Sequence, residues 1–291
     1  MNRLAFEEQG LHASLGGQTI LHDLSVRLRA GAWTSIVGPN GAGKSTFLKA
    51  LAGLLPCTGQ RLCLGRPWEQ WSRHERARTL SWLGQSEATA DDLGAYDLVM
   101  LGRLPHQPWL APASAQDHHA VEQAMRQTQC WEWRERPLGT LSSGERQRVL
   151  LARALAVQAE LMLMDEPLTN LDPPHQADWM QLVRGLVDQG RTVVSVLHEV
   201  SIALHADDLV VMAQARVLNH GTCADPGGGS GDVTDVFKSS WDNNFLYQGT
   251  VRADPAALVD VESGTGRDLN ADGAIGFRLV GADATQATFK G

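Results

Sequence analysis

Apolar and polar positions follow two different patterns along the chain. They alternate through residues 1 to about 30, most clearly from Ile20 to Leu28, and this alternation predicts antiparallel strands with one buried face. Continuous apolar runs at 161–164 and 192–197 instead predict strands that are buried on both faces of a parallel sheet. Residues 179–189 between these runs predict a crossover helix, so this part of the chain indicates an α/β fold.

The middle of the chain is mostly helical in character. Helices are expected from about residue 97 to residue 133, with a break at Pro105, Pro108 and Pro112, because proline interrupts a helix. A further helix is predicted over 145–156, where apolar residues recur at helical spacing. Two shorter strands are predicted as well, at 60–64 and 80–84.

Residues 38–45 match the pattern G-x-x-x-x-G-K-S of a loop that holds nucleotide phosphates. The matching residues are Gly38, Pro39, Asn40, Gly41, Ala42, Gly43, Lys44 and Ser45, with Thr46 directly after them. In such a loop the backbone N–H groups point inward, Lys44 reaches the β- and γ-phosphates, and the Ser45 hydroxyl binds Mg²⁺. A predicted strand at 33–37 and a predicted helix at 46–54 flank the loop, which favours this interpretation over a glycine-rich turn that matches by chance.

Two more stretches supply chemistry for the same nucleotide. The apolar run 161–164 ends in Asp165 and Glu166. Asp165 would hold the Mg²⁺ shell and Glu166 would polarise the attacking water as general base, the alternative being a strand that simply ends in charged residues. Residues 141–145 combine serine hydroxyls, a glycine and a helix N-terminus into a second anion site, although such turns are also common before helices.

The order of these motifs, over residues 1 to about 222, closely resembles the nucleotide-binding subunit of ATP-binding-cassette (ABC) transporters. The resemblance implies a P-loop NTPase of the α/β class. It would have a mixed core sheet with flanking helices, an antiparallel N-terminal β subdomain, a helical signature subdomain and a short acidic C-terminal extension. The implied activity is hydrolysis of ATP to ADP and phosphate, coupled to transmembrane transport, with ATP and Mg²⁺ as cofactors.

The resemblance also assigns roles to individual residues. Residues 141–145 look like the family signature, with Ser143 at a place where glycine is usual. The residues that would contact ATP there are Ser142, Ser143, Gly144 and Glu145. Gln85 matches the glutamine that contacts Mg²⁺ and senses the transporter partner, and Asp172 lies in a loop that crosses to the opposing subunit. His198 matches the histidine that hydrogen-bonds the γ-phosphate, whereas a histidine at a strand end would otherwise be structural.

The partners follow from the same resemblance. Two copies would face head to tail as a homodimer, with each ATP held by Lys44 of one chain and Ser142 of the other. ATP binding would close this dimer and hydrolysis would reopen it. The region between Gln85 and Leu141 would dock onto a membrane-embedded permease, and a periplasmic or surface substrate-binding protein is a further expected partner. The chain is therefore expected on the cytoplasmic side of the inner (plasma) membrane, held there through the permease.

The class of cargo is suggested by residues 99–106, by His175 and Gln176, and by residues 198–200. Together they resemble importers of iron–siderophore, haem and vitamin B12, with cobalamin favoured by overall look alone. Gly102-Arg103 followed by Pro105-His106 is a short match. The alternative interpretation of these residues is a helix N-terminus that is ended by proline, with no relation to cargo. This subunit does not touch the cargo, and direction of transport is a property of the permease, so neither is decided by this chain.

The adenine contact departs from the family pattern. Family members usually stack adenine on an aromatic residue near the N-terminus, where this chain has Leu15. An apolar contact from Leu15 would replace the stack, and His12 is the other candidate. The sequence leaves both open.

Composition narrows the function further. With 43% hydrophobic residues the chain can bury a sizeable core, and its net charge of −8 argues against a nucleic-acid partner. An ABC ATPase of DNA repair or translation is the alternative function. Such proteins usually carry paired cassettes, long coiled coils or basic arms, and none of these is found here. The four cysteines form no C-x-x-C pair, which favours buried thiols in a reduced cytosolic protein. No signal peptide is expected, and because the sequence contains no run of 18 apolar residues, no membrane-spanning helix is expected either.

Composition changes after residue 222. We expect an ABC-type ATP-binding domain over 1–222, a Gly-rich linker over 223–231 and an acidic tail of unknown role over 232–291. Residues 268–275 resemble the first half of a Ca²⁺ loop, but the twelfth position is Leu279 instead of glutamate, so a surface turn is favoured and Ca²⁺ is not expected there. A foreign fusion, a frame disruption and a small accessory domain all remain open as origins of the tail.

Overall fold

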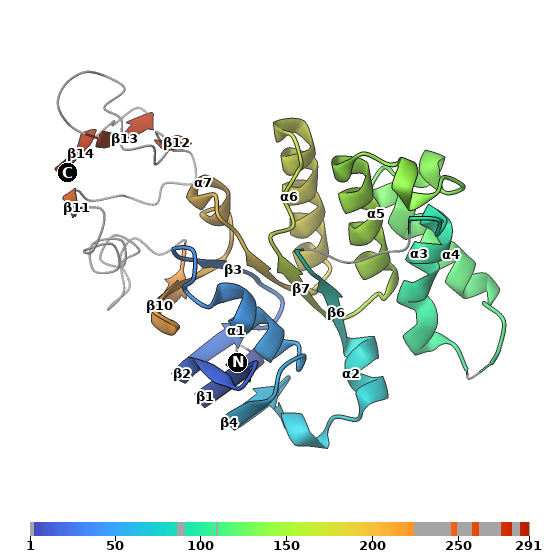
Figure 1. Cartoon of the computed structure of the whole chain (residues 1–291), viewed down its shortest axis with the longest axis horizontal. Coiled ribbons are helices and arrows are strands. Elements are labelled where there is room, and N and C mark those ends of the chain that lie inside the picture. Colours follow the sequence, from blue (N-terminus) through green and yellow to red (C-terminus); the bar gives the residue numbers. More distant parts are fainter. Residues whose placement is uncertain are drawn as a thin grey trace. The chain divides into compact units, whose positions relative to one another are not determined.

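The computed structural model describes three stretches of the chain in full and the backbone of four strands beyond them (Figure 1). The stretches described in full are 3–85, 91–108 and 110–223. The four strands are β11 (Leu246–Gln248), β12 (Leu258–Val261), β13 (Ile275–Val280) and β14 (Gln286–Lys290). The chain divides into two compact units. The first comprises Met1–Trp33 and Ser45–Val196, and the second comprises Thr34–Lys44 and Leu197–Gly291.

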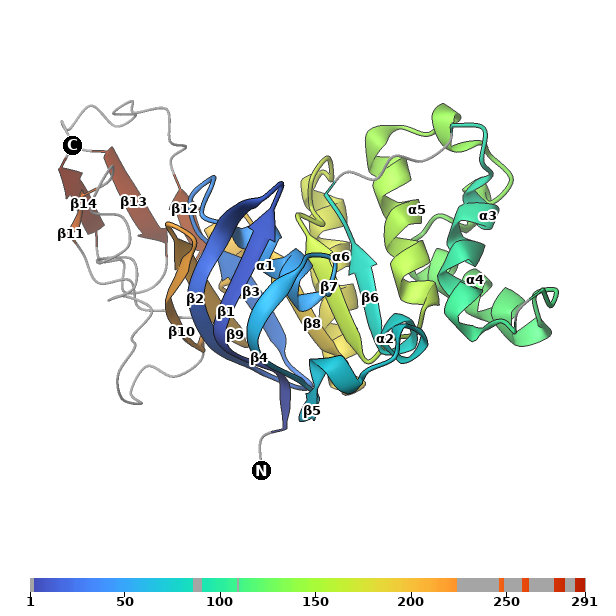
Figure 2. The same cartoon turned by 60° about the horizontal axis from the view of Figure 1, so that its bottom comes forward.

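The first unit begins with an antiparallel sheet that has the strand order β2-β1-β4-β5 (Figure 2). Its strands are β1 (Leu4–Leu15), β2 (Gln18–Arg29), β4 (Cys57–Cys63) and β5 (Arg66–Pro67). Buried and exposed residues alternate along β2, so that Leu24, Val26 and Leu28 pack inward while the residues between them face solvent. The predicted antiparallel strands are confirmed, although β4 begins at Cys57 instead of Gln60.

Three parallel strands lie next to one another in the first unit. They are β6 (Leu80–Leu83), β7 (Leu161–Asp165) and β8 (Thr192–Val196). The middle strand β7 pairs with both neighbours, and every residue of β7 and β8 is buried. This burial confirms the prediction from the continuous apolar runs, because a strand that is covered on both faces has no side for polar residues.

Helix α6 (Pro173–Asp188) connects β7 to β8 and confirms the predicted crossover helix, but it begins at Pro173 instead of Trp179. The Asp172 side chain caps this helix by accepting a hydrogen bond from the His175 N–H. Proline is well suited to the first helical turn, where its missing N–H would have no partner anyway. The apolar pattern alone therefore placed the start too late.

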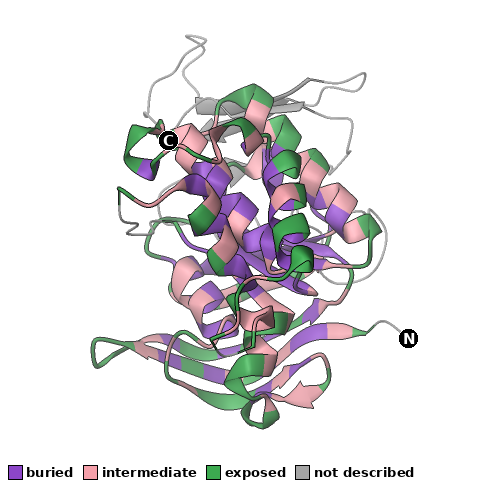
Figure 3. Cartoon of the chain, turned by 90° about the vertical axis from the view of Figure 1, so that its right-hand side faces the viewer, coloured by how far each residue is buried: buried purple, intermediate pink, exposed green. Residues whose placement is uncertain are grey.

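Between β5 and β7 the first unit is mostly helical, with β6 as the one strand described there. The helices are η1 (Trp68–Gln70), α2 (Arg73–Thr79), α3 (Ala95–Met100), η2 (Leu101–His106), α4 (Ala115–Gln127), η3 (Trp131–Trp133), η4 (Leu138–Thr140) and α5 (Ser143–Ala156), where η marks a 3₁₀ helix. The predicted break at Pro105 is shifted, because Pro105 lies inside η2 and the chain becomes extended at Gln107. Figure 3 shows helices that are buried along one side and exposed along the other, as expected of amphipathic helices around a core.

The second unit combines two segments that are far apart in the sequence, Thr34–Lys44 and Leu197–Gly291. Strand β3 (Trp33–Val37) pairs in parallel with β9 (Asp208–Ala213), and β9 pairs antiparallel with β10 (Arg216–Thr222). Helix α1 (Lys44–Leu51) begins at Lys44, the last residue of the first of these segments, and continues in the first unit, where it ends at Leu51 instead of Leu54. Helix α7 (Val200–Ala203) belongs to the second unit.

The four strands beyond residue 223 form a separate antiparallel sheet with the order β11-β14-β13-β12. Residues 224–231 of the predicted linker and residues 268–274 of the calcium-like loop lie outside the described residues. Leu279 lies in β13, opposite Val259. The predicted domain boundaries and the prediction about Ca²⁺ therefore stay predictions.

The four cysteines are free thiols. Burial raises the pKa of Cys63 to about 12 and that of Cys130 to about 11, which keeps both thiols protonated and unreactive at neutral pH. Within the described part of the chain, no helix has the length and apolar character to cross a membrane.

Candidate functional site

The phosphate loop lies in the second unit. Gly38 has φ 149°, and a Cβ built there would stand 2.0 Å from the Met212 carbonyl oxygen, so only glycine fits this position. The Lys44 ammonium donates to the carbonyl oxygens of Gly38, at 2.7 Å, and Pro39, at 3.0 Å. The Ala215 N–H donates to the Ala42 carbonyl and ties the loop to the turn after β9. These contacts fold the predicted loop around the buried Lys44 side chain.

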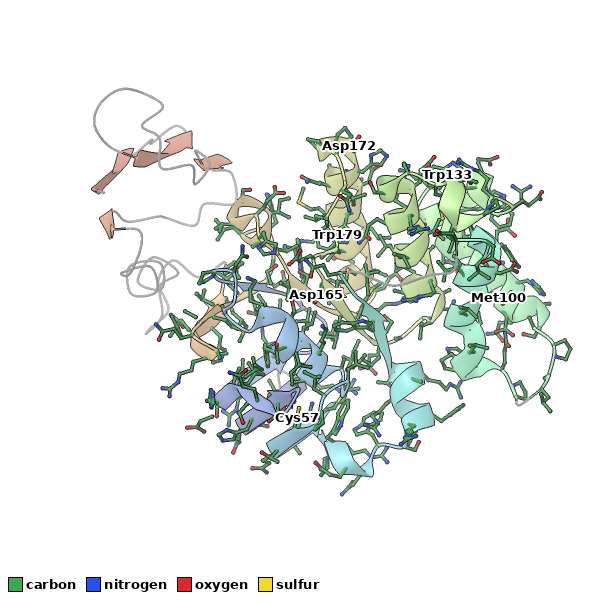
Figure 4. The ribbon with its side chains drawn as sticks, in the orientation of Figure 1. Cys57, Met100, Trp133, Asp165, Asp172 and Trp179 are labelled. Atoms are coloured by element: carbon green, nitrogen blue, oxygen red, sulfur yellow. The ribbon has the colours of Figure 1, made fainter. Side chains whose placement is uncertain are left out.

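Two of the three residues predicted to bind Mg²⁺, Ser45 and Asp165, meet in the first unit. The Ser45 hydroxyl donates to Asp165 Oδ1 at 2.9 Å, and Asp165 is the buried last residue of β7 (Figure 4). Mg²⁺ prefers such oxygen ligands and commonly takes only one or two from the protein, with phosphate and water completing its shell. No group of three or more histidine, cysteine, aspartate or glutamate residues gathers as a metal site anywhere among the described residues. The donor set therefore fits Mg²⁺ that arrives with a nucleotide.

The predicted general base lies directly beside these ligands. Gln85 Nε2 donates to Glu166 Oε2 at 2.6 Å, which brings together two predicted residues from distant parts of the chain. The Glu166 N–H donates to the Val196 carbonyl at 3.1 Å, and Glu166 has φ 52°. A non-glycine residue in this left-handed region is strained, and such strain is concentrated at functional sites. The backbone of Glu166 is thus held by the Val196 carbonyl and its carboxylate by Gln85.

The predicted signature lies at the N-terminus of α5. Ser142 caps the helix by accepting a hydrogen bond from the Glu145 N–H, and Glu145 accepts one in return from the Ser142 N–H at 2.8 Å. The hydrogen bond from the Ser142 backbone, together with the Arg136 guanidinium at 3.3 Å, lowers the pKa of Glu145. Ser143 is exposed. A Cβ on Gly144 would stand 3.1 Å from the Asn170 carbonyl oxygen, so α5 and the segment before Asp172 are closely packed.

The remaining predicted residues occupy two places. Asp172 lies at the start of α6 (Figure 4), where its hydrogen bonds from the His175 side chain and backbone lower the pKa of the carboxyl group. His198 lies in the second unit, exposed, shortly after β8. The structure therefore brings Ser45, Asp165, Gln85 and Glu166 together in the first unit.

Comparison with known proteins identifies the family of this chain. The family model described as ABC transporter matches residues 21–169. The chain belongs to the ABC transporter family. This membership confirms the predicted family, the predicted fold class and the predicted class of activity, an ATPase coupled to transport.

Three relatives are similar over about three quarters of the chain. The iron(3+)-hydroxamate import ATP-binding protein FhuC of Bacillus subtilis is 34% identical over 225 residues, covering 76% of this chain and 83% of the relative. The hemin import ATP-binding protein HmuV of Rhodococcus jostii is 40% identical over 219 residues, or 74% of each protein. The cobalamin import ATP-binding protein BtuD of Halobacterium salinarum is 37% identical over 221 residues, covering 75% of this chain but only 55% of the relative.

A solved structure supports the fold alone. The dimeric structure of MJ0796, a bacterial ABC transporter cassette, has a TM-score of 0.69 and 22% sequence identity to this chain. The match covers 76% of this chain and 99% of the cassette.

In this ABC cassette the adenine contact stays a prediction. Leu15 ends β1 and is 52% exposed, so its side chain is accessible to a ligand. His12 is exposed as well, and its Nδ1 accepts a hydrogen bond from the Asp23 N–H at 3.4 Å.

Sequence reasoning missed two buried ion pairs of the cassette. Arg61 Nε donates to Glu8 Oε2 at 3.0 Å, and Arg61 Nη2 donates to the Ala50 carbonyl, near the end of α1, at 2.6 Å. The Arg61 guanidinium also lies over the Trp68 ring, 4.7 Å from its centroid. The second pair, Arg103 with Asp117, lies at the end of α5. An acidic residue at an inward position of the alternating pattern was the available signal for Glu8.

Proposed function

We propose that this chain is the ATP-hydrolysing subunit of an importer that carries a metal chelate, such as iron–siderophore, haem or cobalamin, through a separate permease. The observation that carries the proposal is the pairing of Ser45 with Asp165 and of Gln85 with Glu166 at the end of β7. Those pairings support a Mg²⁺ site at Ser45 and Asp165, with Glu166 as the carboxylate base next to Asp165 in the chain. The proposed cargo class follows the names of the relatives that are 34–40% identical to this chain.

The proposed chemistry uses each residue in one role. Bound Mg²⁺ would supply positive charge that offsets the charge of the phosphates, and Ser45, Asp165 and Gln85 would hold it. Glu166 accepts the proton of the attacking water, and its orientation is set by the Gln85 hydrogen bond and the left-handed backbone. Lys44 and His198 donate hydrogen bonds to phosphate oxygens. Removal of the γ-phosphate ends those contacts.

The proposed dimer places Ser142 of one chain on the ATP held by Lys44 of the other. As a helix cap, the Ser142 hydroxyl accepts from the Glu145 N–H, so its own hydrogen is available for a phosphate oxygen. The Glu145 carboxylate accepts a hydrogen bond from the Ser142 N–H and pairs with Arg136. The positive charge of Arg136 offsets the negative charge of Glu145, which would otherwise repel phosphate. Ser143, Gly144 and Asp172 complete the proposed contact surface.

The proposed setting is the cytoplasmic face of the inner membrane. A permease would supply the membrane-spanning segments and hold this subunit there, and a substrate-binding protein would deliver the chelate. The cassette would comprise residues 1–222, with residues 223–231 as linker to the tail.

The Glu166→Gln variant tests the proposed base. Purified with Mg²⁺ and ATP, the variant should bind ATP as the wild type does, hydrolyse almost none of it and accumulate as a closed dimer. Glu160→Gln, at a partly exposed glutamate paired with Arg3, is the matched control and should keep wild-type turnover. Normal turnover by Glu166→Gln would refute the assignment.

The importer itself is tested by growth. A strain that lacks this chain should fail to grow when haem, an iron–siderophore or cobalamin is the sole source of the nutrient. Unchanged growth on all three would remove the proposed cargo class while leaving the ATPase assignment intact.

A further inference from the structure

The Gly-Arg and Pro-His residues of η2 lie at the C-terminal end of α5. The last carbonyl groups of a helix have no partner within the helix and need one from outside. Arg103 Nη1 donates to the Ala156 carbonyl at 2.7 Å, and His106 Nε2 donates to the Val157 carbonyl at 2.8 Å. The residues that resemble those of importers therefore form a cap on the signature helix.

Arg103 joins three elements at one buried guanidinium. Besides the Ala156 carbonyl on α5, it binds Asp117 Oδ1 on α4 through Nε at 2.9 Å. Arg103 is 2% exposed and Asp117 is 4% exposed. Burial works to raise the pKa of Asp117, but hydrogen bonds from Ser114 and Arg103 outweigh it and hold that pKa at about 2. The pair is therefore fully charged at neutral pH, and the cation lies where the helix dipole favours one.

Gly102 brings the backbone of η2 directly against α5. A Cβ built on Gly102 would stand 2.3 Å from the Arg153 carbonyl oxygen, which is closer than any side chain can come. Arg153 in turn reaches the Trp82 carbonyl in β6 at 3.4 Å. The last turn of α5 is thus fixed to η2 and to the strand that leads to Gln85.

A change at this end of α5 reaches the other end. The helix has 14 residues, which is about 21 Å at the rise of an α-helix. Ser142 lies at its N-terminus as the cap residue. Because the helix is a rigid rod, a shift or tilt of its C-terminal turn moves Ser142 as well.

We propose that Arg103 is a positioning residue for ATP: with Gly102 and His106 it holds the end of α5 so that Ser142 meets the nucleotide of the opposing chain. The inference rests on the proposed role of Ser142 in a head-to-tail dimer. Arg103 touches no nucleotide in this arrangement and acts through α5.

Dimer closure and ATP binding by one chain must be measured separately. The full chain with Glu166→Gln is used so that bound ATP is not consumed. ATP affinity is measured with a fluorescent ATP analogue at protein concentrations where the chain is monomeric. The ATP concentration that gives half-maximal dimer is measured by sedimentation. Arg103→Leu should leave the affinity of the monomer within about twofold and weaken dimer formation about tenfold.

A second variant protects the test against loss of folding. Gly102→Ala keeps every charge and pushes η2 away from α5, so it should weaken the dimer in the same direction as Arg103→Leu. Arg103→Lys keeps the charge but loses the paired donors, and it should restore part of the dimer. Urea unfolding of each variant reports the folded fraction, because a purely structural role lowers the amount of active protein without moving the ATP midpoint.

Matched controls use residues outside the cap that Gly102, Arg103 and His106 form on α5. Gly185→Ala, on α6, has open space around the added methyl group, and Arg126→Leu, on α4, removes an exposed ion pair with Glu122. Both should dimerise as the parent does.

Ser142→Ala separates the two possible failures. If Ser142→Ala weakens the dimer while Arg103→Leu and Gly102→Ala dimerise normally, the cap on α5 has no positioning role. The inference is then overturned, and the proposed role of Ser142 stands. If Ser142→Ala also dimerises normally, the proposed role of Ser142 fails and the inference fails with it.

Discussion

Helices α1 and α5 carry the proposed phosphate contacts at their N-termini, and each is held at its other end by a buried arginine. Arg61 binds the Ala50 carbonyl near the end of α1 and pairs with Glu8. Arg103 binds the Ala156 carbonyl at the end of α5 and pairs with Asp117. In the first unit, a buried arginine therefore donates to a carbonyl group near the C-terminal end of each helix.

The two anchors differ in what surrounds the carboxylate. Burial raises the pKa of Glu8 to about 7, although Arg61 works in the opposite direction, whereas Asp117 gains hydrogen bonds from Ser114 and has a pKa of about 2. Glu8 and Arg61 lie in the paired strands β1 and β4, while Asp117 and Arg103 lie in helices. An anchor in a sheet is fixed by the strand ladder. An anchor made of helices moves with them, which suits the proposed contact of Ser142 with another chain.

The largest effect is expected from removing Arg61. Arg61→Leu leaves Glu8 buried without its partner, so the free energy of unfolding should fall by about 3–5 kcal/mol in urea titrations. The exposed pair of Arg27 with Glu7 gives a matched control, since Arg27→Leu should cost no more than about 1 kcal/mol. Equal losses in the two variants would show that the Arg61 anchor contributes no more than a surface pair.

The two anchors should change the free energy of unfolding in opposite directions as the pH rises. The pKa of Glu8 is about 7 in the folded chain against an ordinary 4.5, so the folded chain binds that proton more tightly. The free energy of unfolding should therefore fall, by up to about 3 kcal/mol from this group, as the pH rises from 4.5 to 7. Asp117 contributes the opposite slope, because its lowered pKa adds stability that is lost as the pH falls toward 2.

Urea titrations of the wild type and of Glu8→Gln at several pH values between 4.5 and 7 measure this difference. Glu8→Gln should show a shallower loss of stability across that range, because glutamine has no proton to release. The same slope in both proteins would mean that the buried Glu8 carboxyl does not titrate there.

The N-termini of the two helices should fail at different steps. Lys44→Ala should weaken ATP binding by the monomer about tenfold to a hundredfold, because it removes a charged hydrogen-bond donor. Ser142→Ala should leave that affinity unchanged and weaken only the ATP-dependent dimer, about tenfold. Ligand titration measures ATP binding by the monomer, and sedimentation measures the dimer. If Ser142→Ala weakened ATP binding by the monomer, it would contradict an ATP site shared between Lys44 of one chain and Ser142 of the other.

The smallest effect concerns glycines in helical segments. Gly185→Ala on α6 has no atom within 4 Å of the added carbon, so it should stabilise the chain by about 0.5–1 kcal/mol through helix propensity. Gly102→Ala should destabilise it, because the added carbon meets the Arg153 carbonyl. Thermal unfolding compares the pair, and stabilisation by both would mean that η2 does not lie against α5.

Local signals in the sequence predicted local structure well. The 38–45 loop, the alternation in β2 and the apolar run of β7 each depend on residues only a few positions apart. The starts of α5 and α6 were predicted too late, because capping by Ser142 and Asp172 extends each helix beyond its apolar pattern. The serine and glutamate three residues apart at 142 and 145 were the missed signal for α5.

What the sequence by itself determined is the family, together with the residues proposed for phosphate, Mg²⁺ and water, because both follow from motifs and their order. Only the tertiary structure decided that Gln85 donates to Glu166, that Ser45 donates to Asp165 and that Arg103 closes the end of α5. Those contacts join segments far apart along the chain. Burial requires the Arg103 guanidinium to find partners. Which partner each of these polar groups finds depends on how the strands and helices pack.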